Sequence, residues 1–282
     1  MMPRVSPLRG LALLCCITLV SCSKSQRITG PVVDAAREGG AARAKAGIDD
    51  VPLLGHTFTP GSSNPYFPLV PGTAYHYRGR TKDGIETEVF QVLHQTQVVQ
   101  GVTTQVIQDD VWLDGVLIEH TLDWFAQDED GNVWYFGEDV TNTDPVTGVS
   151  DHDGSWEAGV AGAEAGIIML AHPAVGDAYF EENAGAVARD HAAVLALDGK
   201  VNTPDGRFRN CLRTENTTPL EPAFLENKFY AASVGLVMEI NVTDKERNEL
   251  VDVTGPGIGD SSDKKNAADT GNPGVPRRAD AE

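Results

Sequence analysis

Basic residues are scarce in this sequence, and they are missing altogether from its middle. Its 282 residues include 22 Lys and Arg against 41 Asp and Glu, so the formal net charge is −19. No Lys or Arg occurs between Lys82 and Arg189. A chain this acidic repels the phosphate backbone of nucleic acids, which excludes nucleic-acid binding as the expected function.

Cysteines and long apolar runs are also few. Beyond the N-terminal region, no segment approaches the ~18 consecutive apolar residues of a membrane-spanning helix. Of the 4 cysteines, Cys15, Cys16 and Cys22 lie near the N-terminus, and Cys211 stands alone in the body of the chain. A disulfide within the body is therefore excluded, and we expect Cys211 to be a buried structural thiol.

The N-terminus has the features of an export signal. Arg4 and Arg9 precede a short apolar run, Leu11–Val20. The run ends in Leu19-Val20-Ser21-Cys22, which resembles the lipobox of bacterial lipoproteins. This resemblance implies a diacylglycerol on Cys22 and a further acyl chain, such as palmitate, on its amine. Two or more chains suffice for stable membrane anchoring. Because Ser23 stands where Asp would mark inner-membrane retention, we expect the outer membrane of a bacterial envelope as the location.

Composition predicts four parts in the chain. Residues 1–21 are the signal peptide, and residues 22–63, rich in small residues, are a flexible tether behind the lipid. Residues 64–254 carry most of the apolar residues and form the folded domain. Residues 255–282, which are mainly Gly, Asp, Lys, Pro and Ala, are a disordered tail.

The folded part has the pattern of an all-β domain. Six Asp-Gly pairs suit the positive φ angles of type I′ hairpin turns, and alternating apolar segments flank the first three of them. Short strands joined by tight turns predict an antiparallel meander, closed or half-closed into a barrel. The stretch from Gly154 to Pro173 breaks this rhythm, so we expect one long Gly-rich loop or a short helix there.

Several motifs of the folded part resemble a family of uncharacterised secreted bacterial proteins. They are Asn64-Pro65-Tyr66-Phe67-Pro68-Leu69, Asp123-Trp124-Phe125-Ala126-Gln127-Asp128, Gly131-Asn132-Val133-Trp134-Tyr135-Phe136-Gly137-Glu138 and Gly154-Ser155-Trp156-Glu157-Ala158-Gly159. The resemblance implies a secreted all-β domain. It implies no catalytic residue, because the family has no established activity.

The window without basic residues is a candidate cation site. A two-residue turn at Asp114-Gly115 would place Asp110 opposite Glu119, with Asp123 two positions along and Glu138 on the next strand. Carboxylates without basic neighbours suit a hard cation, and calcium is the candidate outside the cytoplasm. The alternative is a solvated acidic surface, in which these side chains simply point into water.

The same register would pair Asp109 with His120. An Asp that orients a His is a component of acid–base catalysis. The alternative is a satisfied polar bridge in the core. No nucleophile motif accompanies the pair, so a hydrolase remains the secondary interpretation.

The aromatic residues of the middle region are the candidate ligand cavity. They are Trp124, Trp134, Phe136 and Trp156, and such rings line either a packed core or the mouth of a barrel. The leading hypothesis is a lipid-anchored, non-catalytic envelope module that binds a small or apolar ligand or a partner protein. The alternatives are the hydrolase, using Asp109 and His120 with a bound cation, and a structural or interaction protein of the envelope.

Overall fold

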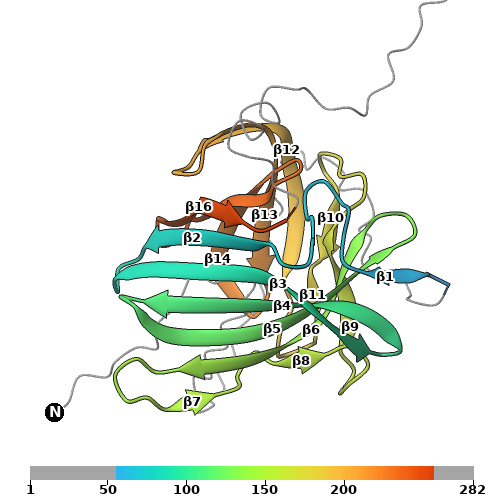
Figure 1. The fold of residues 1–282 in the computed structure, drawn as a ribbon, viewed down its shortest axis with the longest axis horizontal. Coiled ribbons are helices and arrows are strands. Elements are labelled where there is room, and N and C mark those ends of the chain that lie inside the picture. Colours follow the sequence, from blue (N-terminus) through green and yellow to red (C-terminus); the bar gives the residue numbers. More distant parts are fainter. Residues whose placement is uncertain (1–54, 257–282) are drawn as a thin grey trace, which may run out of the picture.

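The structure, a computed structural model, describes residues 55–256, and every regular element in that part is a β-strand (Figure 1). The signal segment, Cys22 and nearly all of the predicted tail lie outside the described residues. No helix in residues 55–256 is long and apolar enough to cross a membrane.

The strands divide at the long excursion after β6. The first group is β1 Phe58–Pro60, β2 Ala74–Arg80, β3 Ile85–Val99, β4 Val102–Leu113, β5 Val116–Asp128 and β6 Val133–Thr143. The excursion carries β7 Ser150–Asp151, β8 Trp156–Glu157, β9 Glu164–Met169, β10 Ala178–Phe180 and β11 Glu182–Asn183. The last group is β12 His191–Asn202, β13 Arg207–Thr218, β14 Glu221–Ala231, β15 Gly235–Asn241 and β16 Glu246–Thr254.

These strands form one antiparallel sheet that curls almost completely around on itself. Its order is β10-β12-β13-β14-β15-β16-β2-β3-β4-β5-β6-β9-β11. Sequence neighbours pair throughout most of this order, as in a meander, and β16 returns to pair with β2. The predicted all-β, antiparallel and nearly closed architecture is therefore confirmed. The stretch expected to be a loop or a short helix instead contains β8 and β9.

The barrel has one seam at which the two edges of the sheet are not joined by continuous strand pairing. There the chain itself connects the edges, because it passes directly from β10 to β11. β10 pairs with β12 and β11 pairs with β9, and only Glu181 separates β10 from β11. The amides of Glu181 and Glu182 both donate to the carbonyl of Asp190, at 2.8 and 3.3 Å. Gly166 of β9 lies so close to this bridge that a Cβ there would collide with the carbonyl oxygen of Glu181. Closure of the barrel thus places two consecutive acidic side chains at the seam.

The N-terminal part of the described chain packs onto the barrel at two places. β1 pairs with β5 and lies on the N-terminal side of Asn64, the predicted start of the domain. Its Phe58 ring packs edge-on against Trp134 and Phe136, at 5.9 and 5.4 Å between centroids. The segment between β1 and β2 carries Phe67 into the core, where its ring meets Phe125 at 5.3 Å.

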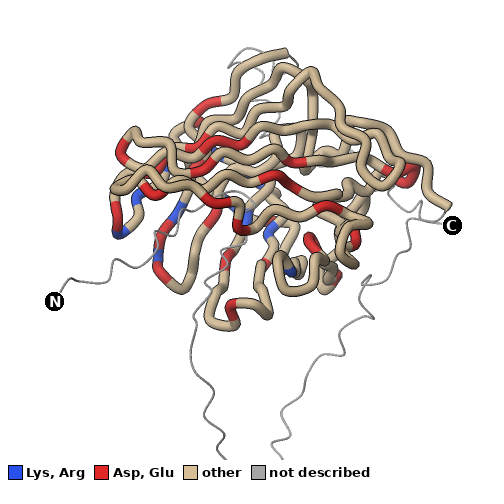
Figure 2. The backbone as a smooth tube through the Cα atoms, turned by 90° about the horizontal axis from the view of Figure 1, so that it is seen from below, with Lys and Arg blue, Asp and Glu red and all other residues tan. Residues whose placement is uncertain are grey.

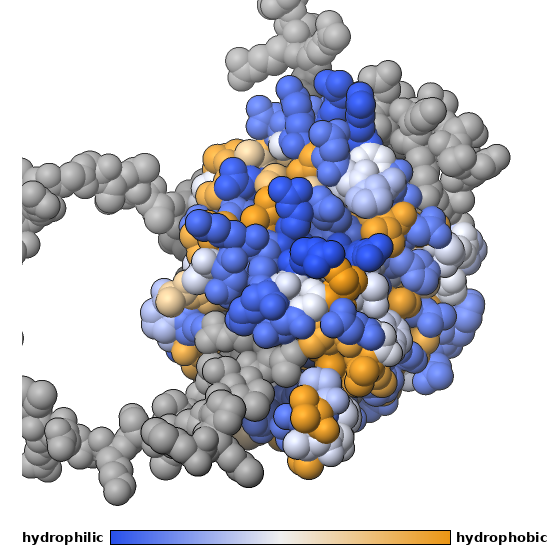
Figure 3. Space-filling model, turned by 90° about the vertical axis from the view of Figure 1, so that its left-hand side faces the viewer, coloured by the Kyte–Doolittle hydropathy of each residue, from blue (hydrophilic) through white to orange (hydrophobic). Residues whose placement is uncertain are grey.

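The core is apolar at the end covered by this segment. Phe67, Phe90 and Phe125 are buried there, and Phe125 stacks on Tyr135 at 4.6 Å. Cys211 is fully buried and free, as predicted. The opposite side, where the β2–β3 and β4–β5 hairpins end, is largely hydrophilic with scattered hydrophobic patches (Figure 3).

Candidate functional site

The interior of the barrel contains a belt of buried carboxyl groups. Figure 2 shows acidic residues along the strands themselves as well as in the loops. Nine of these side chains face inward and are at most 5% exposed; we call them the acidic belt: Glu86, Glu88, Asp109, Asp123, Glu138, Glu181, Glu182, Glu226 and Glu239. Within the described residues, Lys228 is the only buried Lys or Arg. Burying so many ionisable groups is costly unless each is neutralised.

Strand register explains how the belt arises. On β3, Glu86 and Glu88 alternate with outward residues and share the inner face with Phe90, because side chains two positions apart point the same way. Across neighbouring strands, Asp123 lies opposite Glu138 and Lys228 lies opposite Glu239. Each belt residue therefore occupies a regular inward position, apart from Glu181 and Glu182 at the seam.

Near the seam, the side chains of Asp123, Glu138 and Glu182 have few hydrogen-bond donors within reach. Tyr135 donates its hydroxyl to Asp123 Oδ1 at 2.6 Å, and Trp156 Nε1 donates to Glu182 Oε1 at 3.1 Å. Both oxygens of Glu138, together with Asp123 Oδ2 and Glu182 Oε2, are buried without a hydrogen-bond partner. The region thus has more acceptors than the protein supplies donors.

A second group lies between β3 and β4. Glu88 Oε2 accepts a hydrogen bond from Asn248 Nδ2 at 2.6 Å, whereas Glu88 Oε1 and Asp109 Oδ1 have no hydrogen-bond partner. Glu88 faces Tyr77 of β2, and Asp109 faces Phe90. These two carboxyl groups therefore lie next to the aromatic end of the barrel.

The third group surrounds Lys228. Its Nζ lies 3.8 Å from Glu226 Oε2 and 3.8 Å from Glu239 Oε1. Glu181 lies near this cation and accepts a hydrogen bond from Asn216 Nδ2 at 2.5 Å. One ammonium is thus shared among three carboxyl groups.

Burial shifts the protonation of the belt toward the neutral form. Burial raises the pKa of Asp123 to about 7 despite the hydrogen bond from Tyr135, and it raises the pKa of Glu181 to about 7 despite the charge of Lys228. Burial, reinforced by neighbouring carboxylates, holds the pKa of Glu88, Asp109, Glu138, Glu182 and Glu239 well above the usual range. Burial alone would lower the pKa of Lys228, but the carboxylates around it hold that pKa above its usual value.

The hairpin of β4 and β5 has the predicted turn but a different register. Asp114 and Gly115 both have positive φ, at 47° and 84°, as a two-residue type I′ turn requires. A bulge then leaves Ile118 without a cross-strand partner. Val111 consequently pairs with Glu119, whereas the tight turn predicted that it would pair with Ile118. The extra residue lets Ile118 pack in a small cluster with Val111 and Leu113.

This bulge changes which residues meet across β4 and β5. The expected pairing of Asp109 with His120 is wrong, since Asp109 lies opposite Thr121 inside the barrel. His120 lies opposite Asp110, and its Nδ1 is 2.5 Å from Asp110 Oδ1, with the His side chain 40% exposed. The hydrolase hypothesis therefore loses the pair on which it rested.

The same shift in register places the residues predicted to bind calcium on two different faces of the sheet. Asp110 does not face Glu119; it accepts a hydrogen bond from Gln108 Nε2 at 2.6 Å beside His120. Glu119, Asp123 and Glu138 lie on the inner face, and Asp123 does pair with Glu138. In residues 55–256, no three His, Cys, Asp or Glu side chains come together in a way that could hold a metal ion. Calcium binding stays a prediction.

The aromatic residues predicted to line a cavity lie in the packed body of the domain. Trp134 and Phe136 lie beneath Phe58, Trp156 packs edge-on against Tyr135 at 5.3 Å, and Trp124 is half-buried. None of these four belongs to the lining of the pocket at the apolar end.

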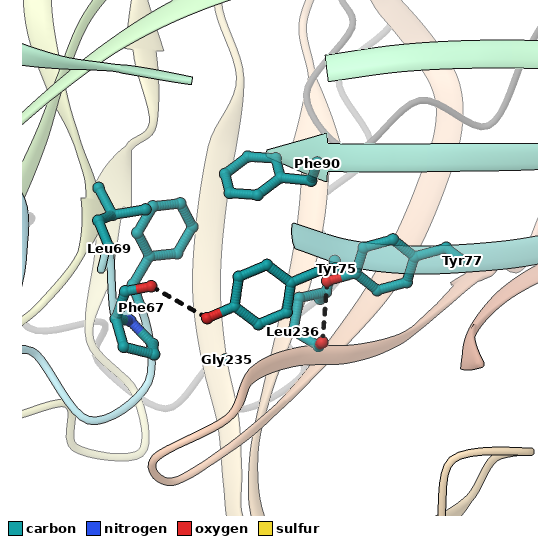
Figure 4. Close-up of a pocket in the computed structure, with 8 residues that line it drawn as sticks. Phe67, Leu69, Tyr75, Tyr77, Phe90, Gly235 and Leu236 are labelled. Atoms are coloured by element: carbon teal, nitrogen blue, oxygen red, sulfur yellow. Dashed lines mark hydrogen bonds between the residues drawn. The ribbon is translucent and has the colours of Figure 1, made fainter. Parts of the chain in front are cut away.

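That pocket lies between the N-terminal segment, β2, β3 and β15 and has a free volume of about 20 Å³, room for about one water molecule (Figure 4). Its lining is Phe67, Pro68, Leu69, Tyr75, Tyr77, Phe90, Gly235 and Leu236. Tyr75 donates its hydroxyl to the Pro68 carbonyl at 3.3 Å, and Tyr77 donates to the Leu236 carbonyl at 3.1 Å. With both hydroxyls occupied, the pocket presents mainly ring and aliphatic surface.

Most of the belt and the pocket were missed by the sequence interpretation. The signal was present on β3, where Glu86 and Glu88 occur in the same alternating positions as Phe90 and Val92. Acidic residues on an apolar face of a strand predict buried carboxyl groups. The consecutive Glu181 and Glu182 carry no such signal, because an alternating strand would bury only one of them.

Comparisons with known proteins add little to this picture. No protein-family model and no curated protein matches the chain. Among solved structures, it is similar to a "putative exported protein with YMCC-like fold" from Bacteroides fragilis, with 15% identity, a TM-score of 0.36, and coverage of 67% of this chain and 98% of that one. It is also similar to a "putative lipoprotein" from Parabacteroides distasonis, with 13% identity, a TM-score of 0.35, and coverage of 68% and 99%. At these TM-scores, neither likeness carries an argument about this protein.

Proposed function

We propose that this protein is a lipid-anchored protein of the bacterial envelope whose barrel is a non-catalytic binding module for a small ligand. The observation that carries the binding proposal is the small pocket at the apolar end, whose lining is mainly aromatic and aliphatic. Binding sites are typically concave and largely apolar, with a few polar groups nearby. Here the belt supplies those groups, because Glu88 and Asp109 are the cross-strand neighbours of the lining residues Tyr77 and Phe90.

A binding role is favoured over catalysis by the arrangement of the side chains. Asp110 and His120 lie on the outer face of the sheet, because Asp110 pairs with Val89 while the neighbouring Asp109 and Phe90 face inward. The pocket lining itself holds no Ser, Cys or His. With a free volume of about 20 Å³, room for about one water molecule, the pocket is far below the ~300 Å³ of ordinary small-molecule sites, so a ligand enters only where the lining side chains move apart.

The binding proposal predicts that a compact organic molecule enters the pocket. We suggest adding benzyl alcohol, benzoate and benzylamine separately to the mature chain with labelled Leu methyl groups. At least one compound should shift the methyl resonances of Leu69 and Leu236, which line the pocket. Leu117, which is 40% exposed on the β4–β5 hairpin, is the internal control and should not respond. If no compound affects Leu69 or Leu236, a structural or interaction role replaces the binding proposal.

The anchoring proposal rests on the lipobox-like sequence that ends at Cys22. Cys22→Ala should abolish lipidation, because the thioether forms on that sulfur, and should move the protein out of the membrane fraction. The mass of the N-terminal peptide and the distribution between membrane and soluble fractions test this. Cys16→Ala, a matched cysteine substitution within the expected signal, should leave both unchanged. An unlipidated wild-type protein would refute the anchor.

A further inference from the structure

The last part of β3 is an edge of the sheet that no other described strand covers. β2 pairs with β3 as far as Gln91, and backbone hydrogen bonds with Gly72 and Thr73 extend this contact to Val92. Beyond that point β3 pairs with β4 alone, and the hairpin of the two strands continues past the end of β2 (Figure 1). Five consecutive side chains of β3, at residues 94–98, are exposed. β3 therefore ends as an outer strand with both faces accessible.

Hydrogen bonds within the hairpin show which way the backbone groups of this edge point. The Gln97 carbonyl accepts a hydrogen bond from Thr104 Oγ1 at 2.9 Å, so it points toward β4. Because successive residues of a strand direct their N–H and C=O groups to alternate sides, those of Thr96 and Val98 point away from β4. Within residues 55–256, no group bonds to them from that side. The edge thus presents donors and acceptors at the spacing of a β-ladder.

The hairpin is held in place at both of its ends. Where the register of β3 and β4 shifts, the buried side chain of Gln105 donates from Nε2 to the carbonyls of Leu93 and Gln95, at 2.5 and 2.9 Å. At the turn, Gln100 lies against Gly159, where an added Cβ would be 3.1 Å from Gln100 Cγ. The open edge is therefore positioned by packing, as a preformed pairing surface would be.

This hairpin lacks the features that usually protect an exposed edge. Edge strands are normally shielded by Lys, by Pro or by inward-pointing charges. Residues 89–108 contain no Asp, Glu, Lys, Arg or Pro, although the formal net charge of the chain is −19. A basic partner would be drawn to the acidic surface elsewhere. Two copies of so acidic a chain repel one another over most of their surfaces, and the uncharged hairpin is where they can meet.

We propose that two copies of this protein associate through this edge, as an antiparallel strand pair centred on Gln97. With the twofold axis at Gln97, Thr96 of each copy lies opposite Val98 of the other, and each such pair exchanges two backbone hydrogen bonds. Gln97 then faces its own copy as the non-hydrogen-bonded pair between them. The contact is self-complementary, as a twofold contact requires, and it joins the two sheets into one.

Sedimentation velocity of residues 23–282, which carry neither the predicted signal nor the lipid, tests the association. The wild-type chain should sediment with the mass of a dimer. Thr96→Pro should sediment as a monomer, because Pro removes the outward N–H and leaves the bonds to β4 in place. Thr96→Val keeps that N–H and is the matched control, which should remain dimeric. A wild-type chain that stays monomeric up to about 100 μM, or a dimeric Thr96→Pro, would overturn the proposal.

A cysteine on the proposed axis tests the register without depending on the proline variant. Opposite residues of a non-hydrogen-bonded pair have Cα atoms about 4.5 Å apart, a distance that a disulfide spans. Gln97→Cys should form a disulfide-linked dimer at least about tenfold faster than Val160→Cys, since association holds the two thiols together. Val160 is 54% exposed and lies outside the hairpin, and Cys211 is buried. Equal rates for the two variants would contradict pairing at Gln97.

Discussion

Replacing Lys228 by Met should lower the free energy of unfolding by about 3–5 kcal/mol, because it leaves buried carboxylates without their cation. The Lys228 ammonium is buried 3.8 Å from both Glu226 and Glu239, and the charge of Glu181 also acts on it. Met retains the length and the apolar stem, so the loss reports mainly the missing charge. Urea denaturation at neutral pH measures the change.

Two further variants show whether the loss comes from charge. Lys200→Met, at an exposed position of β12, should change the free energy of unfolding by no more than about 0.5 kcal/mol. Adding Glu239→Gln to Lys228→Met should recover part of the loss, because one uncompensated carboxylate is removed. A Lys228→Met protein as stable as wild type would mean that the ammonium does not hold the belt together.

Asp123→Asn should make the free energy of unfolding less dependent on pH. The difference in this free energy between pH values well below and well above 7 should shrink by on the order of 4 kcal/mol. Burial raises the pKa of Asp123 in the folded protein to about 7, from an ordinary value of 3.8. A group with a raised folded pKa contributes its stabilisation fully below the unfolded pKa and loses it as the pH rises through about 7. Asn keeps the acceptor for the Tyr135 hydroxyl but cannot ionise.

The effect is measured by urea denaturation of wild type and variant between pH 4 and pH 8. The wild-type profile should fall more steeply than that of Asp123→Asn over this range. The exposed Asp83→Asn variant should keep the slope of wild type. Parallel profiles for wild type and Asp123→Asn would show that Asp123 titrates as an ordinary carboxyl group.

Local sequence rules predicted the architecture but not the alignment of its strands. The Asp114-Gly115 turn follows from the residues themselves, since both adopt positive φ readily. The bulge at Ile118 does not, because it depends on the packing of Ile118 against Val111 and Leu113. That single inserted residue moved Asp110, not Asp109, beside His120 and so removed the expected catalytic pair from the interior.

The candidate site depends even more on tertiary contacts. Asp123 and Glu138 were predicted to approach one another, because a tight turn joins their strands. Glu226 and Glu239 meet Lys228 through local pairing, because Glu226 is two positions away on β14 and Glu239 lies opposite Lys228 on β15. Glu181 reaches this cluster from the seam, which requires the sheet to curl around. The pocket likewise needs Phe67 from the N-terminal segment beside β2, β3 and β15, which no periodicity of the sequence predicts.

The central claim is that the barrel encloses carboxyl groups neutralised by protons. The most direct test compares the free energy of unfolding of the wild-type protein at pH 5 with that at pH 8. Most of the belt has a raised pKa in the folded state, so the protein should be more stable at pH 5 than at pH 8 by several kcal/mol. Proteins stabilised by ionised carboxylates change little over this range, because they lose that stability only below about pH 5. Equal stability at the two pH values, or greater stability at pH 8, would contradict the account.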